Sequence, residues 1–319
     1  MHKIYQKIKY KIKENYFLYV ILINIKAHVL DFLNKAFGYH YTKRRFYKKL
    51  GYPLNLKNPK SYNQKIFWKK IYDRNPLLPV TADKYQVRSY IKEILGEEKA
   101  KELLIPLFYV TDKPETIPFE KLPSAFIVKP NHASGRYIIV KDGKFNKEKI
   151  IDTCRRWLVT PYGLDKLEWS YRSINRKIVI EALLKEDNGT SPKEFKFHMF
   201  HGKCKAVRVI FDRMNHISGS YFDEKWHFLP VKKPTHPQGR KIEKPENYER
   251  MLELAEKFAE NFDYVRVDLY NINGKIYFGE LTHYPASGIA IFEPISFDFE
   301  LGQHWKIKTE YWKKNDNKY

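Results

Sequence analysis

Residues 265–282 read Val265-Arg-Val-Asp-Leu-Tyr-Asn-Ile-Asn-Gly-Lys-Ile-Tyr-Phe-Gly-Glu-Leu-Thr282, and they decide the fold of this chain. An Asn273-Gly274 pair lies between two apolar runs, which is typical of a β-hairpin. A two-residue turn would place Asp268 and Glu280 on opposite faces of the strand pair. A three-residue loop, with Gly274 in the left-handed conformation, would place both acids on one face.

The three-residue loop, residues 272–274, separates charged from apolar side chains, so we predict that register. The polar face would then carry Arg266, Asp268, Glu280 and Thr282. The apolar face would carry Val265, Val267, Leu269, Tyr277 and Leu281. Two carboxylates this close repel each other unless a cation lies between them. Hard oxygen ligands favour Mg²⁺, held by one or two carboxylates and by substrate phosphates, so the hairpin predicts a magnesium site.

Size and composition limit the classes of protein to consider. The 319 residues suffice for one large or two medium domains. A net charge of +22 attracts polyanions, such as nucleic acid, anionic lipid and acidic substrates. The two cysteines, Cys154 and Cys204, fit no metal or redox spacing, so we expect a reducing, cytoplasmic setting. We find no secretory signal, and the apolar run 16–25 is too short to span a bilayer.

The first fifty residues form a distinct basic region. They contain twelve Lys or Arg against two acids, Glu14 and Asp31, which leaves a net charge of +10. Apolar residues compatible with a helix are interleaved with this charge. Two interpretations stay open: an amphipathic segment on an anionic membrane surface, or a helix pair that packs on the main domain.

The rest of the chain predicts helices mixed with antiparallel hairpins. Helices are predicted at 61–74, with Ser61 as N-cap, and at 83–103, 146–158 and 246–260. Strands are predicted at 105–110, 125–129, 137–141, 177–184, 194–200 and 203–211. Residues 212–244 are predicted to be irregular and to carry a long functional loop. This order indicates an α+β fold rather than strict βαβ alternation.

A second motif reads Phe126-Ile-Val-Lys-Pro-Asn-His-Ala-Ser-Gly-Arg136. An apolar strand brings Lys129 to its end, and a loop of small and donor residues follows. Backbone N–H groups near Gly135 can surround phosphate oxygens, and Lys129 adds charge. The glycine and lysine spacing is not that of a P-loop. An ordinary hairpin with a lysine extended to solvent explains the motif equally well.

Two strand ends offer polar groups in succession. Glu181 lies near the end of a predicted strand, and a loop then leads to Glu194 and Lys196. Such a strand end can offer backbone groups to an adenine edge and an acid to a ribose. Taken alone, a plain strand-loop-strand is the better interpretation.

Two further groups of charges are less specific. Asp83 and Lys84 open a predicted helix, where an acid suits the helix dipole and a lysine can reach a phosphate. Arg208, Asp212 and Arg213 lie on or just past a predicted strand. They would bind an anionic substrate or pair with one another.

In order along the chain, these motifs resemble those of the ATP-grasp superfamily. A narrower set of motifs resembles the teichuronopeptide-biosynthesis TupA-like branch, over roughly residues 55–305. That set is Tyr62-Asn-Gln-Lys-Ile66, Tyr72-Asp-Arg-Asn-Pro76, Lys129-Pro-Asn-His-Ala-Ser-Gly135, Phe200-His-Gly-Lys203 and Phe278-Gly-Glu-Leu-Thr282.

The resemblance implies an ATP-grasp fold, in which two α+β subdomains clasp ATP. Here we expect a helical, basic N-terminal extension to precede them. The expected divisions are a basic helical segment at 1–60, a small subdomain at 61–185, and a large subdomain with the magnesium-binding hairpin at 186–319. ATP and Mg²⁺ are the implied cofactors.

The resemblance also implies roles for residues. The implied nucleotide-binding residues are Lys84 and Lys129 on the phosphates, His132, Ser134 and Gly135 in the loop that closes over them, Glu181, Ala182, Leu183 and Leu184 at the adenine, Glu194 near the ribose, and Lys196 near the phosphates. Asp268 and Glu280 would hold Mg²⁺. Thr282 stands where many members of the superfamily have Asn, which leaves a second metal ion undecided. The expected catalytic residues are Arg266, on the transferred phosphoryl group, with Lys196, Arg208 and Arg213.

The resemblance implies a carboxylate–amine ligase that activates its acid as an acylphosphate. The positive net charge favours an acidic sugar or glycan substrate, such as a uronic acid, with an amine as co-substrate. We therefore expect a role in cell-surface polysaccharide biosynthesis, in the cytoplasm and at the inner face of the membrane if the basic segment binds lipid.

Three other functions are open alternatives. A glycosyltransferase is disfavoured because the chain contains no Asp-x-Asp sequence. A phosphotransferase would use the same ATP site and differ only in its product. The third is a non-enzymatic basic protein that binds nucleic acid or membrane, which the net charge alone supports. It leaves the hairpin acids unexplained, and nucleic acid is a poor fit as a partner because those acids would repel a polyanion.

Overall fold

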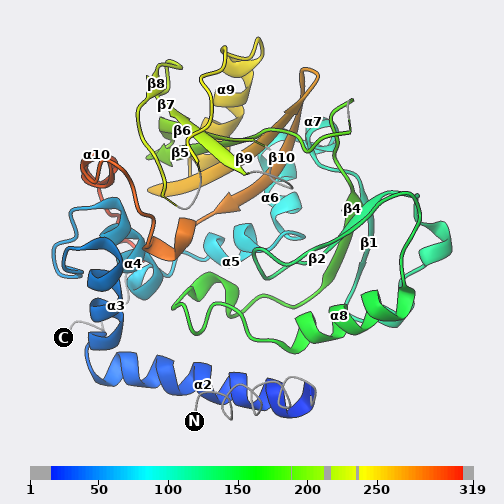
Figure 1. The fold of residues 1–319 in the computed structure, drawn as a ribbon, viewed down its shortest axis with the longest axis horizontal. Coiled ribbons are helices and arrows are strands. Elements are labelled where there is room, and N and C mark those ends of the chain that lie inside the picture. Colours follow the sequence, from blue (N-terminus) through cyan, green and yellow to red (C-terminus); the bar gives the residue numbers. More distant parts are fainter. Residues whose placement is uncertain (1–15, 188, 212–216, 235–236, 312–319) are drawn as a thin grey trace. The chain divides into compact units, whose positions relative to one another are not determined.

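Two antiparallel sheets organise this computed structural model, which describes residues 16–187, 189–211, 217–234 and 237–311 (Figure 1). The chain forms two units. The first combines the chain up to Thr42 with Leu107–Ala182, and the second combines Lys43–Pro106 with the chain from Leu183 onward. The mixed helices and antiparallel sheets confirm the predicted α+β fold. The expected division of the sequence at residues 60 and 185 stays a prediction.

The described elements have the following bounds. The α-helices are α2 (Tyr16–Ala36), α3 (His40–Leu50), α4 (Tyr62–Tyr72), α5 (Leu77–Ala82), α6 (Val87–Leu95), α7 (Glu97–Leu103), α8 (Lys147–Val159), α9 (Tyr248–Ala259) and α10 (Ser296–Gln303). The 3₁₀ helices are η1 (Pro114–Thr116), η2 (Phe119–Lys121), η3 (Trp169–Tyr171) and η4 (Pro285–Gly288). The strands are β1 (Leu107–Thr111), β2 (Phe126–Pro130), β3 (Ile138–Val140), β4 (Ile178–Ala182), β5 (Glu194–Phe200), β6 (Lys203–Phe211), β7 (Ser218–Phe222), β8 (Phe228–Leu229), β9 (Tyr264–Ile272) and β10 (Lys275–Thr282).

The first unit contains a four-stranded sheet in the order β1-β4-β2-β3. Val128 of β2 lies opposite Ile180 of β4, and both are buried in one cluster with Ile150 of α8. Because side chains alternate between the faces of a strand, Lys129 and Glu181 lie on the face away from this cluster. The apolar alternation of β2 and β4 thus fixes the direction of two predicted site residues.

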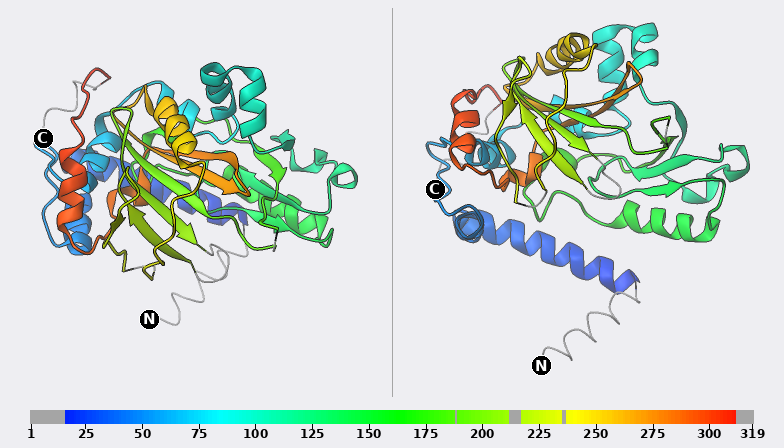
Figure 2. Two further views of the ribbon diagram at one scale, coloured as in Figure 1. Left: turned by 90° about the horizontal axis from the view of Figure 1, so that it is seen from above. Right: turned by 45° about the horizontal axis from the view of Figure 1, so that its top comes forward.

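The second unit contains a six-stranded sheet in the order β10-β9-β5-β6-β7-β8. Phe197 of β5 pairs with Val267 of β9 on one side and with Val207 of β6 on the other, and all three are fully buried. Helix α9 lies across this apolar face (Figure 2), where Tyr248 stacks on Phe197 with ring centroids 6.1 Å apart. The opposite face of the sheet carries the charged residues.

The hairpin of β9 and β10 reaches the predicted segregation of charge by a different route. Its turn has two residues, Asn273 (φ 51°) and Gly274 (φ 80°), and Ile272 pairs with Lys275. The predicted three-residue loop is therefore wrong, because an Asn-Gly pair readily takes two successive positive φ values. A β-bulge at Gly279 then restores the alternation and places Glu280 directly opposite Asp268.

The bulge also corrects one residue of the predicted apolar face. Tyr277 pairs with Tyr270 and shares the face of the acids, whereas Phe278 pairs with Leu269 and is buried. A Cβ atom at Gly279 would lie 2.9 Å from the backbone oxygen of Asp268. The bulge therefore requires glycine at this position.

Two other predicted elements differ from the structure. The helix predicted at 83–103 begins only at Val87 and is divided at Gly96, whose φ of 80° ends α6. Asp83 instead caps a turn, where its side chain accepts a hydrogen bond of 2.7 Å from the backbone N–H of Tyr85. The segment predicted to be irregular, residues 212–244, contains β7 and β8, because strand pairing with β6 overrides a weak apolar pattern. By contrast, Ser61 caps α4 as predicted, in a capping box with Gln64.

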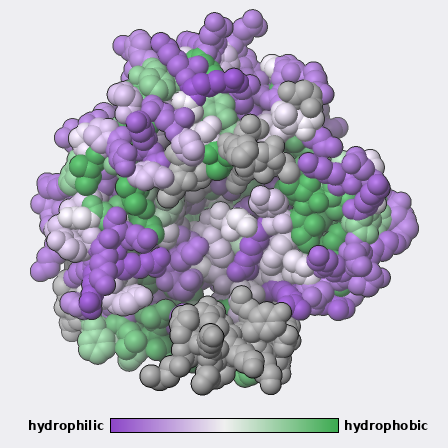
Figure 3. All heavy atoms as spheres, in the orientation of Figure 1, coloured by the Kyte–Doolittle hydropathy of each residue, from purple (hydrophilic) through white to green (hydrophobic). Residues whose placement is uncertain are grey.

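Helix α2 exposes apolar side chains at helical spacing. Part of this apolar surface is visible at the lower left of the molecule (Figure 3). The exposed residues are Leu18, Ile21, Leu22, Ile25, Val29, Phe32 and Leu33. The buried side of the helix carries Ala27, Asp31 and Asn34 instead, and Asp31 forms a 3.0 Å ion pair with Arg172 of the same unit. Helices α2 and α3 thus confirm that the described N-terminal region is helical. The apolar side of α2, however, is exposed rather than packed on the protein.

Within the second unit, a buried lysine of α4 ties this helix to the start of β9. Lys69 donates to Asp73 at 2.6 Å and to Asp263 at 3.0 Å, and Asp263 also accepts from the indole N–H of Trp305. We expect Lys69→Met to lower the free energy of unfolding by about 3–5 kcal/mol, because it leaves two carboxylates buried without their cation. Urea denaturation measures this loss.

The exposed Lys99 of α7 is the matched control, and Lys99→Met should change the free energy of unfolding by less than about 0.5 kcal/mol. Burial raises the pKa of Asp263, but Lys69 and Trp305 outweigh it, so the net shift is downward. The stabilisation from a lowered carboxyl pKa is present above about pH 4 and is lost as the pH falls. An unchanged pH dependence in Lys69→Met would contradict this account.

Candidate active site

One row of paired residues crosses the polar face of the larger sheet. Glu280 pairs with Asp268, Asp268 with Lys196, Lys196 with Arg208, and Arg208 with Tyr221. Directly paired residues on neighbouring strands point to the same face, about 4.8 Å apart. The row therefore runs from two acids through two cations to a tyrosine.

Arg266 joins the two acids. Its Nε and Nη2 donate to the two carboxylate oxygens of Asp268, each at 2.6 Å, and Nη2 lies 3.4 Å from Oε1 of Glu280. Nη2 also donates to Oγ1 of Thr282 at 3.0 Å, and that hydroxyl donates to Glu280 at 2.9 Å. Burial lowers the pKa of Arg266, but Asp268 and Glu280 outweigh it and the net shift is upward. Its guanidinium is thus a permanent positive charge between the acids.

Two lysines complete the charge around the acids. Nζ of Lys196 lies 2.5 Å from Asp268 and 2.8 Å from Glu194, and Nζ of Lys84 lies 3.9 Å from Glu280. Burial raises the pKa of Glu280, but Lys84, Arg266 and Lys196 together lower it to about 2. Glu280 is therefore ionised at every pH at which the protein would work.

The acids fit a magnesium ion that a substrate also holds. Asp268, Glu280 and Thr282 offer hard oxygen atoms, and Arg266 shows that the space between the two carboxylates suits positive charge. Within the described ranges, no cluster of three or more His, Cys, Asp or Glu side chains could hold a metal ion alone. Mg²⁺ needs only one or two carboxylates when phosphate oxygens fill the other positions. The residues therefore fit a nucleotide-bound Mg²⁺ rather than an all-protein metal cage.

The first unit holds a second group of predicted residues. Lys129 forms a 2.5 Å ion pair with the buried Glu181, from adjacent strands. The loop after β2 is anchored by Asn131, which donates to Asn175 and accepts from the backbone N–H of Lys177. The other predicted loop and strand-end residues are the buried His132, the exposed Ser134 and Gly135, and Ala182 at the end of β4.

The structure thus assembles the predicted site residues in two groups, one in each unit. Leu183 and Leu184 follow β4, where the chain passes into the second unit. Arg213 and Asp212 lie outside the described residues, so the role of Arg213 stays a prediction.

Three polar residues on this face were missed by sequence reasoning. Tyr270 donates to Glu194 at 3.1 Å, and period-two alternation from Asp268 is a signal that could have found it. Tyr221 lies on β7, whose Ser-Gly-Ser start hides the strand. Lys233 lies in the loop after β8, where no sequence pattern indicates the direction of a side chain.

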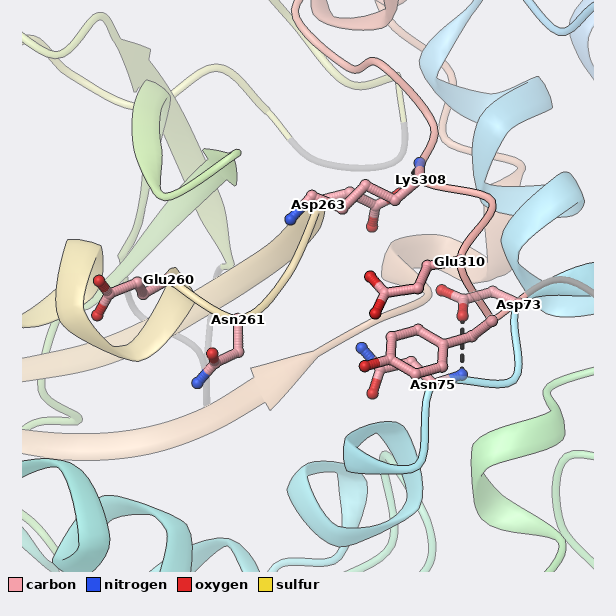
Figure 4. Close-up of a pocket in the computed structure, with 8 residues that line it drawn as sticks. Asp73, Asn75, Glu260, Asn261, Asp263, Lys308 and Glu310 are labelled. Atoms are coloured by element: carbon pink, nitrogen blue, oxygen red, sulfur yellow. Dashed lines mark hydrogen bonds between the residues drawn. The ribbon is translucent and has the colours of Figure 1, made fainter.

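A cavity of about 180 Å³ lies elsewhere in the second unit (Figure 4). Acids prominent in its lining include Asp73 and Asp263, both of which bind Lys69. Asp73 also accepts from the backbone N–H of Asn75 at 2.9 Å. These acids support the fold, so the polar row on the sheet is the better candidate site.

Comparison with known proteins follows from this geometry. A family model described as TupA-like ATPgrasp matches residues 64–306. None of the curated proteins compared with the chain is significantly similar to it.

Three solved structures to which the chain is similar are distant from it. D-alanine–D-alanine ligase from Bacillus anthracis is 18% identical, with a TM-score of 0.43, and the match covers 67% of this chain and 60% of that one. The same ligase from Helicobacter pylori is 15% identical, with a TM-score of 0.42, over 77% and 70% of the two chains. D-cycloserine synthetase DcsG is 13% identical, with a TM-score of 0.42, over 72% and 70%. The chain thus spans less than two thirds of the first of these ligases, and likenesses this weak say nothing of its function.

The family model covers most of the chain, including both groups of predicted site residues. The chain therefore belongs to the TupA-like ATP-grasp family, an enzyme family of the ligase type whose cofactors are ATP and Mg²⁺.

Proposed function

We propose that this protein is an ATP- and Mg²⁺-dependent carboxylate–amine ligase acting on an acidic sugar or glycan in cell-surface polysaccharide biosynthesis. The observation that carries the proposal is the pairing of Asp268 with Glu280 beside Arg266 and Lys196. Two ionised acids flanked by cations suit a magnesium-bound polyphosphate. The net charge of +22 supports an acidic substrate, and the proposed co-substrate is an amine.

The reaction needs charge stabilisation rather than a covalent enzyme nucleophile. An oxygen of the substrate carboxylate bonds to the γ-phosphorus of ATP, and ADP leaves with the electron pair of the broken P–O bond. The amine then bonds to the acyl carbon, phosphate leaves with the C–O electrons, and the amine proton passes to solvent. Bound Mg²⁺ would neutralise phosphate charge. Lys196 and Arg266 would add fixed positive charge where the phosphoryl group transfers.

Hydroxylamine trapping tests this function without knowledge of the natural amine. The protein would be incubated with ATP, Mg²⁺, hydroxylamine and, in turn, D-glucuronate, D-galacturonate or L-glutamate. A ligase forms a hydroxamate together with equal amounts of ADP and phosphate. A phosphorylated acid that gives no hydroxamate would indicate a phosphotransferase. Thermal stabilisation by a UDP-sugar but not by ATP with Mg²⁺ would indicate a glycosyltransferase.

We also propose that α2 holds the protein at the cytoplasmic face of an anionic membrane. Phe32 is 68% exposed and Ile25 54% exposed, on the side of α2 away from the buried Asp31. The net charge of +10 in the first fifty residues complements anionic lipid. No helix in the described part of the chain combines the length and the apolar character needed to span a bilayer, so α2 would lie in the interface.

Vesicle flotation tests the membrane role of α2. The double change Ile25→Ser with Phe32→Ser should lower partitioning onto vesicles containing anionic lipid at least about tenfold, because two large apolar side chains no longer enter the interface. Val159, 43% exposed at the end of α8, is the control, and Val159→Ser should leave partitioning unchanged. Equal binding of the double variant and the unaltered protein would rule out this face of α2 as the anchor.

A further inference from the structure

Arg208 is a buried cation at the centre of the row. It is only 8% exposed, and its Nε has no hydrogen-bond partner among the described residues. Among the residues that the structure describes, no carboxylate forms an ion pair with it. Gly219 leaves room for its guanidinium, since a Cβ atom there would lie 3.0 Å from Nε and 3.1 Å from Nη2. The protein therefore shapes a place for this side chain without neutralising it.

Tyr221 and Lys233 surround the same place. Tyr221 lies opposite Arg208 on β7 and is 1% exposed. Its buried hydroxyl has no hydrogen-bond partner in the part of the chain that the structure describes. The guanidinium carbon of Arg208 lies 5.5 Å from its ring centroid. Nζ of Lys233 lies 5.3 Å from the ring centroid of Phe292, and that ring lies 6.2 Å from the ring of Tyr221, centroid to centroid. Burial, followed by Arg208 and Arg266, lowers the pKa of Lys233.

The cations in and beside the row fall into two classes. Arg266 and Lys196 are already paired with Asp268, and with Glu280 or Glu194. Arg208 and Lys233 have no such acid among the described side chains. A buried charge or hydroxyl without a partner costs free energy. The buried Arg208 and Tyr221, with the half-buried Lys233, therefore form a site suited to an anion.

We propose that Arg208, Lys233 and Tyr221, here called the anion subsite, bind the carboxylate that the enzyme activates. This inference rests on the proposed function and names the residues that would select an acid as substrate. The planar guanidinium suits a carboxylate held by two hydrogen bonds, and the ammonium and hydroxyl add donors. The subsite lies past Lys196 in the row, two strands or about 10 Å from Asp268. That spacing puts the carboxylate beside the phosphates rather than on the metal ligands.

Binding measurements separate the acid from the nucleotide. Isothermal titration would measure the Kd of D-glucuronate, D-galacturonate and L-glutamate in the presence of Mg²⁺ and the non-hydrolysable nucleotide AMPPNP, with D-glucose as the neutral control. At least one acid should bind the unaltered protein more tightly than glucose. Lys233→Gln and Arg208→Lys should raise its Kd at least about tenfold, and Tyr221→Phe should raise it less. Lys232→Gln, which removes the exposed neighbouring lysine, should change it less than twofold.

Gly219→Ala is the sharpest variant, because it displaces the guanidinium of Arg208 without changing any charge. It should raise the Kd of the acid at least about fivefold. This variant and the others should leave the Kd of AMPPNP within about threefold of that of the unaltered protein. Lys233→Gln should keep or raise the melting temperature of the ligand-free protein, since the cations nearest to Lys233 repel it.

Three results would overturn the anion subsite. The first is that none of the acids binds more tightly than glucose. The second is that the variants raise the Kd of AMPPNP as much as that of the acid, which would assign these cations to the phosphates. A clear fall in the melting temperature of Lys233→Gln would make Lys233 structural. Failure of the proposed function looks different: the unaltered protein would then either not bind AMPPNP with Mg²⁺, or bind it together with the acid and form no hydroxamate from ATP.

Discussion

Asp268→Asn and Glu280→Gln are each expected to lower the rate of hydroxamate formation by about 10³-fold or more, since metal-ion charge stabilisation contributes several kcal/mol. Each change removes one of the two negative charges that lie opposite each other beside Arg266. Magnesium would then be held by a single acid, and Arg266 and Lys196 would repel it. Single-turnover trapping with hydroxylamine measures the rate.

The nucleotide itself provides a second measurement. In the unaltered protein, Mg²⁺ should tighten AMPPNP binding, and this gain should disappear in both variants. Asp152→Asn, on the exposed surface of α8, is the control and should behave like the unaltered protein. Variants that retain both the rate and the magnesium effect would remove the basis of the proposed function.

Gly279→Val is expected to abolish hydroxamate formation and to lower the free energy of unfolding by about 2–4 kcal/mol. The new side chain would meet the backbone oxygen of Asp268 at 2.9 Å, so the bulge could not persist. A regular ladder would then pair residue 279 with Asp268 and turn Glu280 toward the apolar face of Val267.

Deletion of Gly279 should do less harm than its substitution. Without residue 279, Glu280 follows Phe278 directly, and the present pairs of Phe278 with Leu269 and of Glu280 with Asp268 are both kept. We expect this variant to retain activity within about tenfold. Gly274→Ala is the control in the turn: its φ of 80° costs about 1 kcal/mol, but the register and the rate should not change. A deletion as damaging as Gly279→Val would contradict this account of the bulge.

The hairpin shows how far sequence reasoning reached. Segregation of charge correctly predicted that Asp268 and Glu280 share a face. A one-residue shift of either strand would move its charged side chains to the buried face, so only one register is compatible with burial. The predicted three-residue loop was wrong. One extra residue moves Glu280 to the face of Asp268 whether it lies in the loop or in a β-bulge. The two-residue turn at Asn273-Gly274 and the contact that a Cβ atom at Gly279 would make with the opposite strand distinguish them.

Residues placed by tertiary structure alone could not be predicted. Lys233 comes from a loop, and Tyr221 from a strand whose identity depends on its pairing with β6. The family motifs also did not show which of their residues take part in chemistry and which stabilise the fold. Asn63, from the Tyr62-Asn-Gln motif, donates to the backbone of Ala290 and to the buried Asp298, so it holds segments together rather than facing the polar row.

Arg266 donates hydrogen bonds to both acids, and this affects the order in which metal and nucleotide bind. Because the guanidinium of Arg266 already neutralises the carboxylates, Mg²⁺ without a nucleotide would bind them only weakly. A chelate brings its own anions, which can draw the guanidinium toward the phosphates and release the acids. We therefore expect metal and nucleotide to enter together, as one complex, and the empty enzyme to be indifferent to magnesium.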